Sequence, residues 1–115
     1  MSDAPDARSS TRDLEALRGE LLYLANEKFP AVAKTGGYPV RFNHCFLRIV
    51  YDNLFGARWQ TVLPNPKDRA SRGQAAYKQL DAEQLSRAIE IGERIIDDPE
   101  ACRELNRKSL NWRGK

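Results

Sequence analysis

Apolar residues recur every three or four positions over most of the chain, and this spacing predicts helices rather than strands. The first such stretch starts near Ser10 or Thr11, which are good helix N-caps. It should end at Pro30, because the residue before a proline avoids the α-helical region. The apolar stripe of this helix consists of Leu14, Leu17, Leu21, Leu22, Leu24, Ala25 and Phe29.

A second stretch, residues 43–55, is apolar around more of its circumference than a surface helix needs. Asn43 is expected to cap it, and Gly56 to end it with left-handed backbone. Its apolar side chains cover about 200° of the helical wheel, and they are Cys45, Phe46, Leu47, Ile49, Val50 and Leu54. This breadth predicts that the helix lies at the centre of the fold.

A long connection, residues 57–74, separates this helix from the next. Pro64 and Pro66 exclude a regular helix at that point. Long irregular stretches inside compact domains are often functional or mobile. We therefore keep this loop among the candidate functional segments.

Two more helices follow the loop. Asp81 and Gln84 have the spacing of a capping box, and Asp98 with Pro99 should open the last helix. Gly92 lies within the apolar arc of the third helix, where another helix can approach closely. The inward-facing residues expected in the last helix are Cys102, Leu105, Leu110 and Trp112.

These elements predict an all-α fold, a compact bundle of about four helices with a long proline-containing loop between the second and third. The expected organisation is a flexible N-terminal tail (1–9), a single helical domain (10–112) and a basic C-terminal end (113–115). The length of 115 residues suits one domain, and 41% hydrophobic with 30% charged residues is a globular balance.

Charge is unevenly distributed, although the net charge is only +3. Residues 34–78 carry a net charge of +6 and residues 103–115 of +4, whereas residues 79–102 carry −5. One interpretation is internal complementarity, with acidic helices beside basic loops. The other is a basic face for phosphate or another anion.

Cofactor motifs are not found in the sequence. One histidine and two separated cysteines, Cys45 and Cys102, do not make a zinc site, and no phosphate-binding glycine motif or serine elbow occurs. We therefore expect no metal and no cofactor. We also expect no membrane segment or targeting peptide, and a cytoplasmic protein whose cysteines behave as small buried hydrophobes.

The central helix carries the first candidate site. A narrow polar arc holds His44, Arg48, Tyr51 and Asp52, and Arg48 stands one turn from Asp52. If exposed, this arc is a solvated face with one ion pair, and if covered, it is a buried polar network that must be fully satisfied. Asn53 either bonds to loop backbone, for instance in the proline-rich segment, or orients a ligand.

A second candidate site combines basic and aromatic residues of the loop 58–78 and the tail 103–115. Cations bind phosphates, and aromatic rings stack on bases of single strands. The candidates for binding a polyanion are Arg58, Trp59, Lys67, Arg69, Arg72, Tyr77, Lys78, Arg107, Lys108, Trp112, Arg113 and Lys115.

Three functions remain open. The leading hypothesis is a small non-enzymatic interaction module that docks on a protein partner or self-associates. The second is an accessory protein that binds nucleic acid through the basic loop and tail. The third is a small enzyme or ligand-binding domain centred on His44, Arg48 and Asp52 together with Arg41, with a pocket under the loop around Gly36 and Gly37.

Overall fold

The computed structural model describes residues 7–63 and 76–115, and in these ranges every regular element is a helix. The first long helix is α1 (Ala7–Tyr23), which runs through a π-helical segment η1 (Leu24–Lys28) into α2 (Phe29–Ala33). The others are α3 (Asn43–Phe55), α4 (Ala82–Asp97) and α5 (Pro99–Trp112), and two short 3₁₀ turns are η2 (Trp59–Thr61) and η3 (Ala76–Gln79). The predicted all-α fold with four long helices is confirmed.

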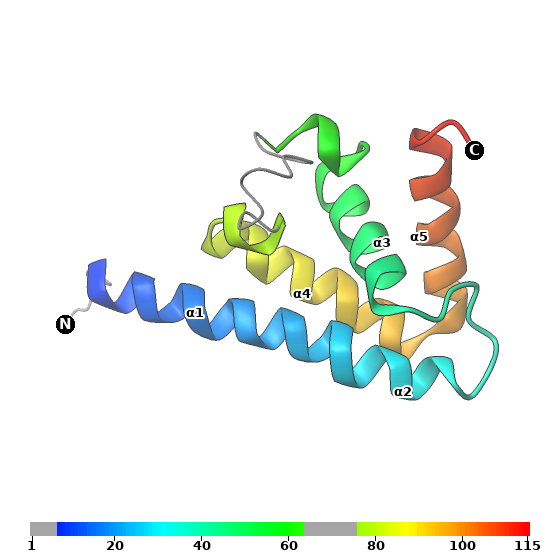
Figure 1. Cartoon of the computed structure of the whole chain (residues 1–115), viewed down its shortest axis with the longest axis horizontal. Coiled ribbons are helices and arrows are strands. Elements are labelled where there is room, and N and C mark those ends of the chain that lie inside the picture. The colour runs from blue at the N-terminus through cyan, green and yellow to red at the C-terminus, as the bar shows by residue number, and fades with distance from the viewer. Residues whose placement is uncertain (1–6, 64–75) are drawn as a thin grey trace.

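The helices form two crossed pairs. Figure 1 shows α1 and α4 lying along each other in the same direction, while α3 and α5 rise side by side from them. α4 packs against α1, α3 and α5, and α3 also packs against α5. This arrangement places the C-terminal end of α3 beside the C-terminal end of α5.

The core consists of the apolar stripes that the sequence predicts. Phe29 and Phe46 are fully buried with ring centroids 4.9 Å apart. Further fully buried side chains are those of Leu21, Ile49, Val50, Leu85, Ala88, Ile95 and Cys102. Tyr51 and Asp52, which the helical wheel placed on a polar arc, are buried as well, because η2 and α5 cover that side of α3.

Gly92 lies where α4 meets its neighbours most closely. A Cβ atom at this position would stand 2.9 Å from Cζ of Phe46 and 3.3 Å from Cδ1 of Leu24. The predicted close approach is therefore confirmed, and the neighbours are side chains of α3 and η1.

Three predicted helix ends are confirmed. Gly56 ends α3 in the left-handed conformation, with φ 66°. The Asp81 carboxylate accepts from the Gln84 backbone N–H at 2.8 Å, and the Gln84 side chain accepts from the Asp81 N–H at 2.9 Å. Asp98 caps α5 by accepting from the Glu100 N–H.

The first helix is longer than predicted at both ends. It begins at Ala7 rather than at Ser10 or Thr11, since no helix-breaking residue separates these positions. Residues 7–9 of the expected tail 1–9 are therefore helical, and residues 1–6 lie outside the described part of the chain.

Pro30 does not end the helix, which continues to Ala33. A proline inside an α-helix loses one hydrogen bond and clashes with the carbonyl four residues earlier. Here the preceding turn is π-helical, and the Phe29 N–H donates to the Leu24 carbonyl. The wider turn gives the proline ring room, so the helix passes through it.

Two further predictions are wrong in detail. Asn43 is not the N-cap, because Phe42 occupies that position and the Asn43 amide donates instead to Oδ1 of Asn26 at 2.7 Å. Trp112 does not face inward, since it is 39% exposed. The buried residues of α5 are Ala101, Cys102, Leu105 and Ser109.

Part of the predicted loop cannot be compared with the structure. Pro64, Pro66, Lys67, Arg69 and Arg72 lie outside the described residues. Among the described helices, none is long and apolar enough to cross a membrane.

The capping box of α4 gives a first testable prediction. Replacing Asp81 with alanine should lower the free energy of unfolding by about 1 kcal/mol, since the Gln84 N–H loses its acceptor. Urea denaturation followed by circular dichroism measures this change. Asp81→Ser should retain most of the stability, and an equal loss in both variants would contradict a capping role.

Candidate functional site

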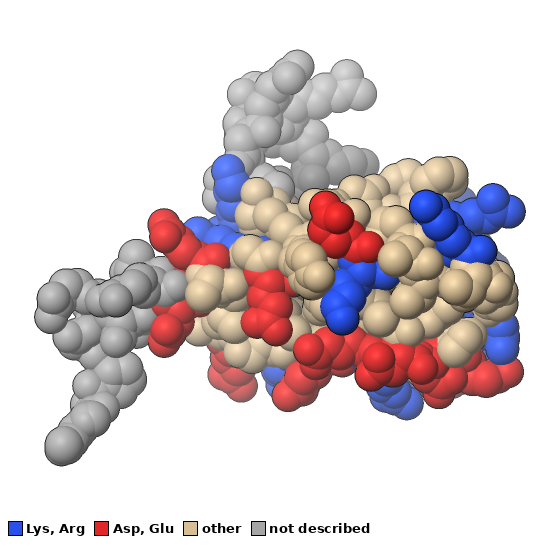
Figure 2. Space-filling model, turned by 90° about the horizontal axis from the view of Figure 1, so that it is seen from below, with Lys and Arg blue, Asp and Glu red and all other residues tan. Residues whose placement is uncertain are grey.

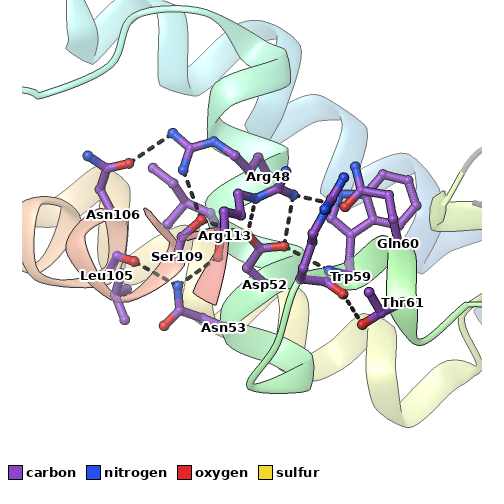
Figure 3. Close-up of polar contacts among 12 residues, drawn as sticks. Arg48, Asp52, Asn53, Trp59, Gln60, Thr61, Leu105, Asn106, Ser109 and Arg113 are labelled. Atoms are coloured by element: carbon purple, nitrogen blue, oxygen red, sulfur yellow. Dashed lines mark hydrogen bonds and ion pairs between the residues drawn. The ribbon is translucent and has the colours of Figure 1, made fainter. Parts of the chain in front are cut away.

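A buried carboxylate organises the end of α3. Asp52 is fully buried and accepts four hydrogen bonds (Figure 3). Its Oδ2 accepts from the Ser109 hydroxyl at 2.6 Å and from Nε of Arg113 at 2.6 Å. Its Oδ1 accepts from the Trp59 N–H at 3.0 Å and from Nη2 of Arg113 at 3.1 Å. The ion pair with Arg113, whose side chain is 15% exposed, compensates the buried charge.

Arg48 belongs to this network, although it donates to Ser109 and Asn106 and not to Asp52 itself. Its Nη1 donates to the Ser109 hydroxyl oxygen at 2.8 Å, and its Nη2 donates to Oδ1 of Asn106 at 2.9 Å. Ser109 thus accepts from Arg48 and donates to Asp52. Of the two interpretations of the polar arc, the structure therefore matches the covered one, a buried polar network. Arg48 and Asp52 do not form the ion pair of the exposed alternative, because Ser109 of α5 lies between them and Arg113, the C-cap of α5, pairs with Asp52 instead.

The network holds one wall of a cavity of about 450 Å³, which we call the α3 pocket. Most of its lining is apolar or aromatic, and Arg48, Arg113, Gln60 and His44 supply the polar groups. The remaining lining residues are Leu22, Leu47, Tyr51, Trp59, Ala76 and Tyr77. An apolar cavity of this size with a few convergent polar groups is typical of a ligand site.

The aromatic side of the pocket is rigidly held. The rings of Tyr51 and Trp59 pack edge to face, with centroids 5.7 Å apart and an interplanar angle of 71°. The Trp59 backbone N–H donates to the Asp52 carboxylate. The neighbouring Gln60 is held as well, because its Oε1 accepts from Nη2 of Arg113 at 3.0 Å. Burial raises the pKa of Tyr51 far above its ordinary value, so the phenol stays protonated. The pocket therefore presents a neutral aromatic surface next to two guanidinium groups.

The structure divides the ligand candidates between two cavities. His44 and Arg48 line the α3 pocket, whereas Arg41 lines a second cavity of about 690 Å³, which we call the loop cavity. The other lining residues of the loop cavity are Pro30, Ala33, Lys34, Gly36, Gly37, Tyr38 and Phe42. The sequence predicted a single pocket under this loop that contained all of these candidates. The structure instead places the residues of α3 around the other cavity.

Asn53 does not bond to loop backbone, which was one of its two expected roles, and it lines a separate cavity of about 430 Å³ beside Trp112. Its amide donates to the Ile49 carbonyl of α3 at 2.8 Å and to the Leu105 carbonyl of α5 at 3.0 Å. It therefore bonds to helix backbone rather than to loop backbone, and it does not line the α3 pocket. Its role is to hold α3 against α5.

The structure brings together three of the basic and aromatic candidates, Trp59 and Tyr77 of the loop and Arg113 of the tail, which line the α3 pocket. Arg113 and Trp59 belong to the Asp52 network, and Arg107 pairs with Glu104 at 2.5 Å. Arg58, Lys78, Lys108, Trp112 and Lys115 are exposed to differing degrees. Figure 2 shows acidic side chains along the lower edge of the face seen from below, with basic side chains among them.

The two cysteines differ in exposure, and this difference gives a second prediction. Cys102 is fully buried, and burial raises the pKa of its thiol to about 11. Cys45 was expected to be buried too, but it is partly exposed. Because thiolates react and thiols do not, a thiol reagent at pH 8 should label Cys45 in the native protein and Cys102 only after unfolding. Equal native labelling rates, measured by mass spectrometry after digestion, would contradict the packing of α5.

Sequence reasoning missed three members of the site, Gln60, Asn106 and Ser109. Ser109 follows Cys102 and Leu105 at helical spacing, and this periodicity is the signal that could have placed it on the buried face of α5. Gln60 and Asn106 carry no such signal, because amides are common on exposed helix and loop surfaces.

In the described ranges, no group of three or more His, Cys, Asp or Glu side chains is placed so that it could hold a metal ion.

Comparison with known proteins identifies no relative, since no family model, no curated protein and no solved structure matches this chain.

Proposed function

We propose that the chain is a small non-enzymatic helical binding module, and that its α3 pocket receives an apolar group carrying a carboxylate. The observation that carries this proposal is the joint lining of one cavity by three aromatic rings and two arginines. Apolar walls favour an apolar body, and guanidinium groups favour a carboxylate because a hydrogen bond between two ionised groups is stronger than one between neutral groups.

The charge at the pocket supports an anionic ligand. Arg48 and Arg113 contribute two positive charges, and Asp52 behind them contributes one negative charge. Among the described residues that line the pocket, none is acidic. The hydrogen bonds among described residues leave Nε of Arg48 and Nη1 of Arg113 without an acceptor. A carboxylate in the pocket would be the natural acceptor for these donors.

We favour binding over catalysis because the reactive groups are occupied or unsuitably placed. The Ser109 hydroxyl is fully buried and already donates a hydrogen bond to Asp52. His44 stacks on Phe42 at the other end of α3, with ring centroids 5.7 Å apart. A nucleophile needs a base within hydrogen-bonding reach, and this pair of residues does not supply one.

The carboxylate has two sources, a free small molecule or the C-terminus of a partner protein. A carboxylate supplied by the C-terminus of a partner protein would agree with an interaction module that docks on a protein. A cytoplasmic location is part of this proposal, and it is supported by the two free thiols, which suit a reducing compartment.

Trp59 fluorescence tests the proposal, with Trp112→Phe as the background so that a single tryptophan reports. The probes are 3-phenylpropionate, its neutral amide, and a tripeptide ending in phenylalanine with a free or an amidated C-terminus. Each carboxylate should bind at least about tenfold more tightly than its amide, as expected for a charge-assisted hydrogen bond. Tighter binding of the peptide acid than of phenylpropionate would favour a protein partner.

Two matched variants show which of the two cavities binds the carboxylate probe. Arg48→Met should remove the preference for the carboxylate, whereas Arg41→Met, which lies outside the α3 pocket, should leave it unchanged. Equal affinity for acid and amide, or no response to millimolar probe, would overturn the proposed function.

A further inference from the structure

Two exposed rings stack at the start of α3. Phe42 and His44 have ring centroids 5.7 Å apart and an interplanar angle of 3°. Phe42 is 63% exposed and His44 is exposed too. Core packing gives no reason for such an arrangement, because a phenylalanine this exposed buries little apolar surface.

The stacked rings join the two cavities. Phe42 lines the loop cavity and His44 lines the α3 pocket. Every lining residue of either cavity that carries a permanent charge is basic, and these residues are Lys34, Arg41, Arg48 and Arg113. Each of the two rings therefore shares a cavity with cationic side chains.

The loop that carries this surface is anchored to the helices. The Tyr38 hydroxyl donates to the Ile96 carbonyl at 2.6 Å, and Arg103 donates to the Gly37 carbonyl. Partial burial, together with nearby negative charges, raises the pKa of Tyr38, which keeps this donor protonated. The backbone between Lys34 and Arg41 is thus fixed to the helices at two points, which lowers the cost of ordering this loop on binding.

We propose that the Phe42–His44 stack, with the cations of both cavities, is a platform for single-stranded nucleic acid. Unpaired bases would stack on the exposed rings, and their phosphates would bind Lys34 and Arg41. A duplex keeps its bases stacked inside the helix, so this surface would favour single strands. The proposal goes beyond carboxylate binding and does not depend on it.

Fluorescence polarisation of a labelled 15-nucleotide oligo(dT) tests the platform at 50 and 200 mM NaCl. The full chain should bind the single strand more tightly than a duplex of the same length, and more weakly at the higher salt concentration. Phe42→Ala and His44→Ala should each weaken binding about tenfold, as expected for loss of one stacked base. The double charge reversal Lys34→Glu with Arg41→Glu should weaken it further.

Matched controls keep the test specific. Tyr23→Ala removes an aromatic side chain of similar exposure, 53%, from α1 and should leave oligo(dT) affinity unchanged. Trp112→Ala with Lys108→Glu tests the tail that the sequence suggested. Absence of binding at 50 mM NaCl, a preference for duplex, or a larger loss in the tail variant than in Phe42→Ala would overturn the platform.

The same variants separate this proposal from the carboxylate pocket. Phe42 does not line the α3 pocket, so Phe42→Ala should retain the affinity for 3-phenylpropionate. If phenylpropionate fails to bind and oligo(dT) binding still depends on Phe42, only the carboxylate proposal fails. If phenylpropionate binds and oligo(dT) does not, only the platform fails.

Discussion

Replacing Asp52 with alanine should lower the free energy of unfolding by about 3–5 kcal/mol, which is typical when one partner of a buried ion pair is removed. The loss is large because three donors lose their acceptor together: the Ser109 hydroxyl, the Trp59 N–H and the Arg113 guanidinium. Urea denaturation followed by circular dichroism at neutral pH measures the effect. The exposed Asp13, replaced by alanine, provides a control that should change stability by less than about 0.5 kcal/mol.

A double-mutant cycle shows whether the effect belongs to the ion pair. Arg113→Met alone leaves the Asp52 carboxylate with a buried and uncompensated charge. Combining it with Asp52→Ala should therefore cost less than the sum of the two single changes, by about 1–3 kcal/mol. Additive losses would mean that the two side chains act independently.

Replacing Gly92 with alanine should destabilise the fold by about 1–3 kcal/mol through overpacking. The added methyl group would come within 2.9 Å of the ring of Phe46, which is fully buried and cannot move away freely. Thermal and urea denaturation both measure this loss.

Gly19 provides the matched control for Gly92, because it also lies within a helix but has open space where a Cβ atom would stand, with no neighbouring atom within 4 Å. Gly19→Ala should stabilise the protein by about 0.5–1 kcal/mol, the ordinary helix preference for alanine over glycine. If Gly92→Ala stabilised the protein equally, the close packing between α4 and α3 would be contradicted.

Local rules predicted most of the helical framework. The capping box at Asp81, the left-handed end at Gly56 and the tight contact at Gly92 follow from residue type and helical spacing alone. Pro30 shows how such a rule fails, because a π-helical turn formed by the preceding residues makes room for the proline ring. The sequence carries no recognised signal for that turn.

The α3 pocket could be predicted only in part. His44, Arg48, Tyr51 and Trp59 were all candidate residues, and the structure brings them around one cavity. Their chemistry depends on Arg113, which is 61 positions from Asp52 and reaches it only when α5 packs beside α3. A helical wheel records the faces of one helix but not its neighbours, and so it assigned Asp52 to a polar arc.

The basic residues 103–115 are a second case in which the sequence does not show which neighbours a side chain meets. Counting charges gave residues 103–115 a positive excess, but the structure pairs Arg103 with Glu100, Arg107 with Glu104 and Arg113 with Asp52. Charge counts do not show which cations are already paired. The basic groups that line the α3 pocket and the loop cavity lie mostly before α4, on the segment 34–42 and on α3.

A nuclear magnetic resonance titration with 3-phenylpropionate tests the central claim most directly. With ¹⁵N-labelled protein, we predict that the largest shifts occur at the Trp59 indole N–H and at the Nε–H group of Arg48, which has no acceptor among the described residues. The Trp112 indole should stay unchanged, because it does not line the pocket. Shifts centred on Trp112 or Arg41, or none at millimolar ligand, would contradict the α3 pocket as the binding site.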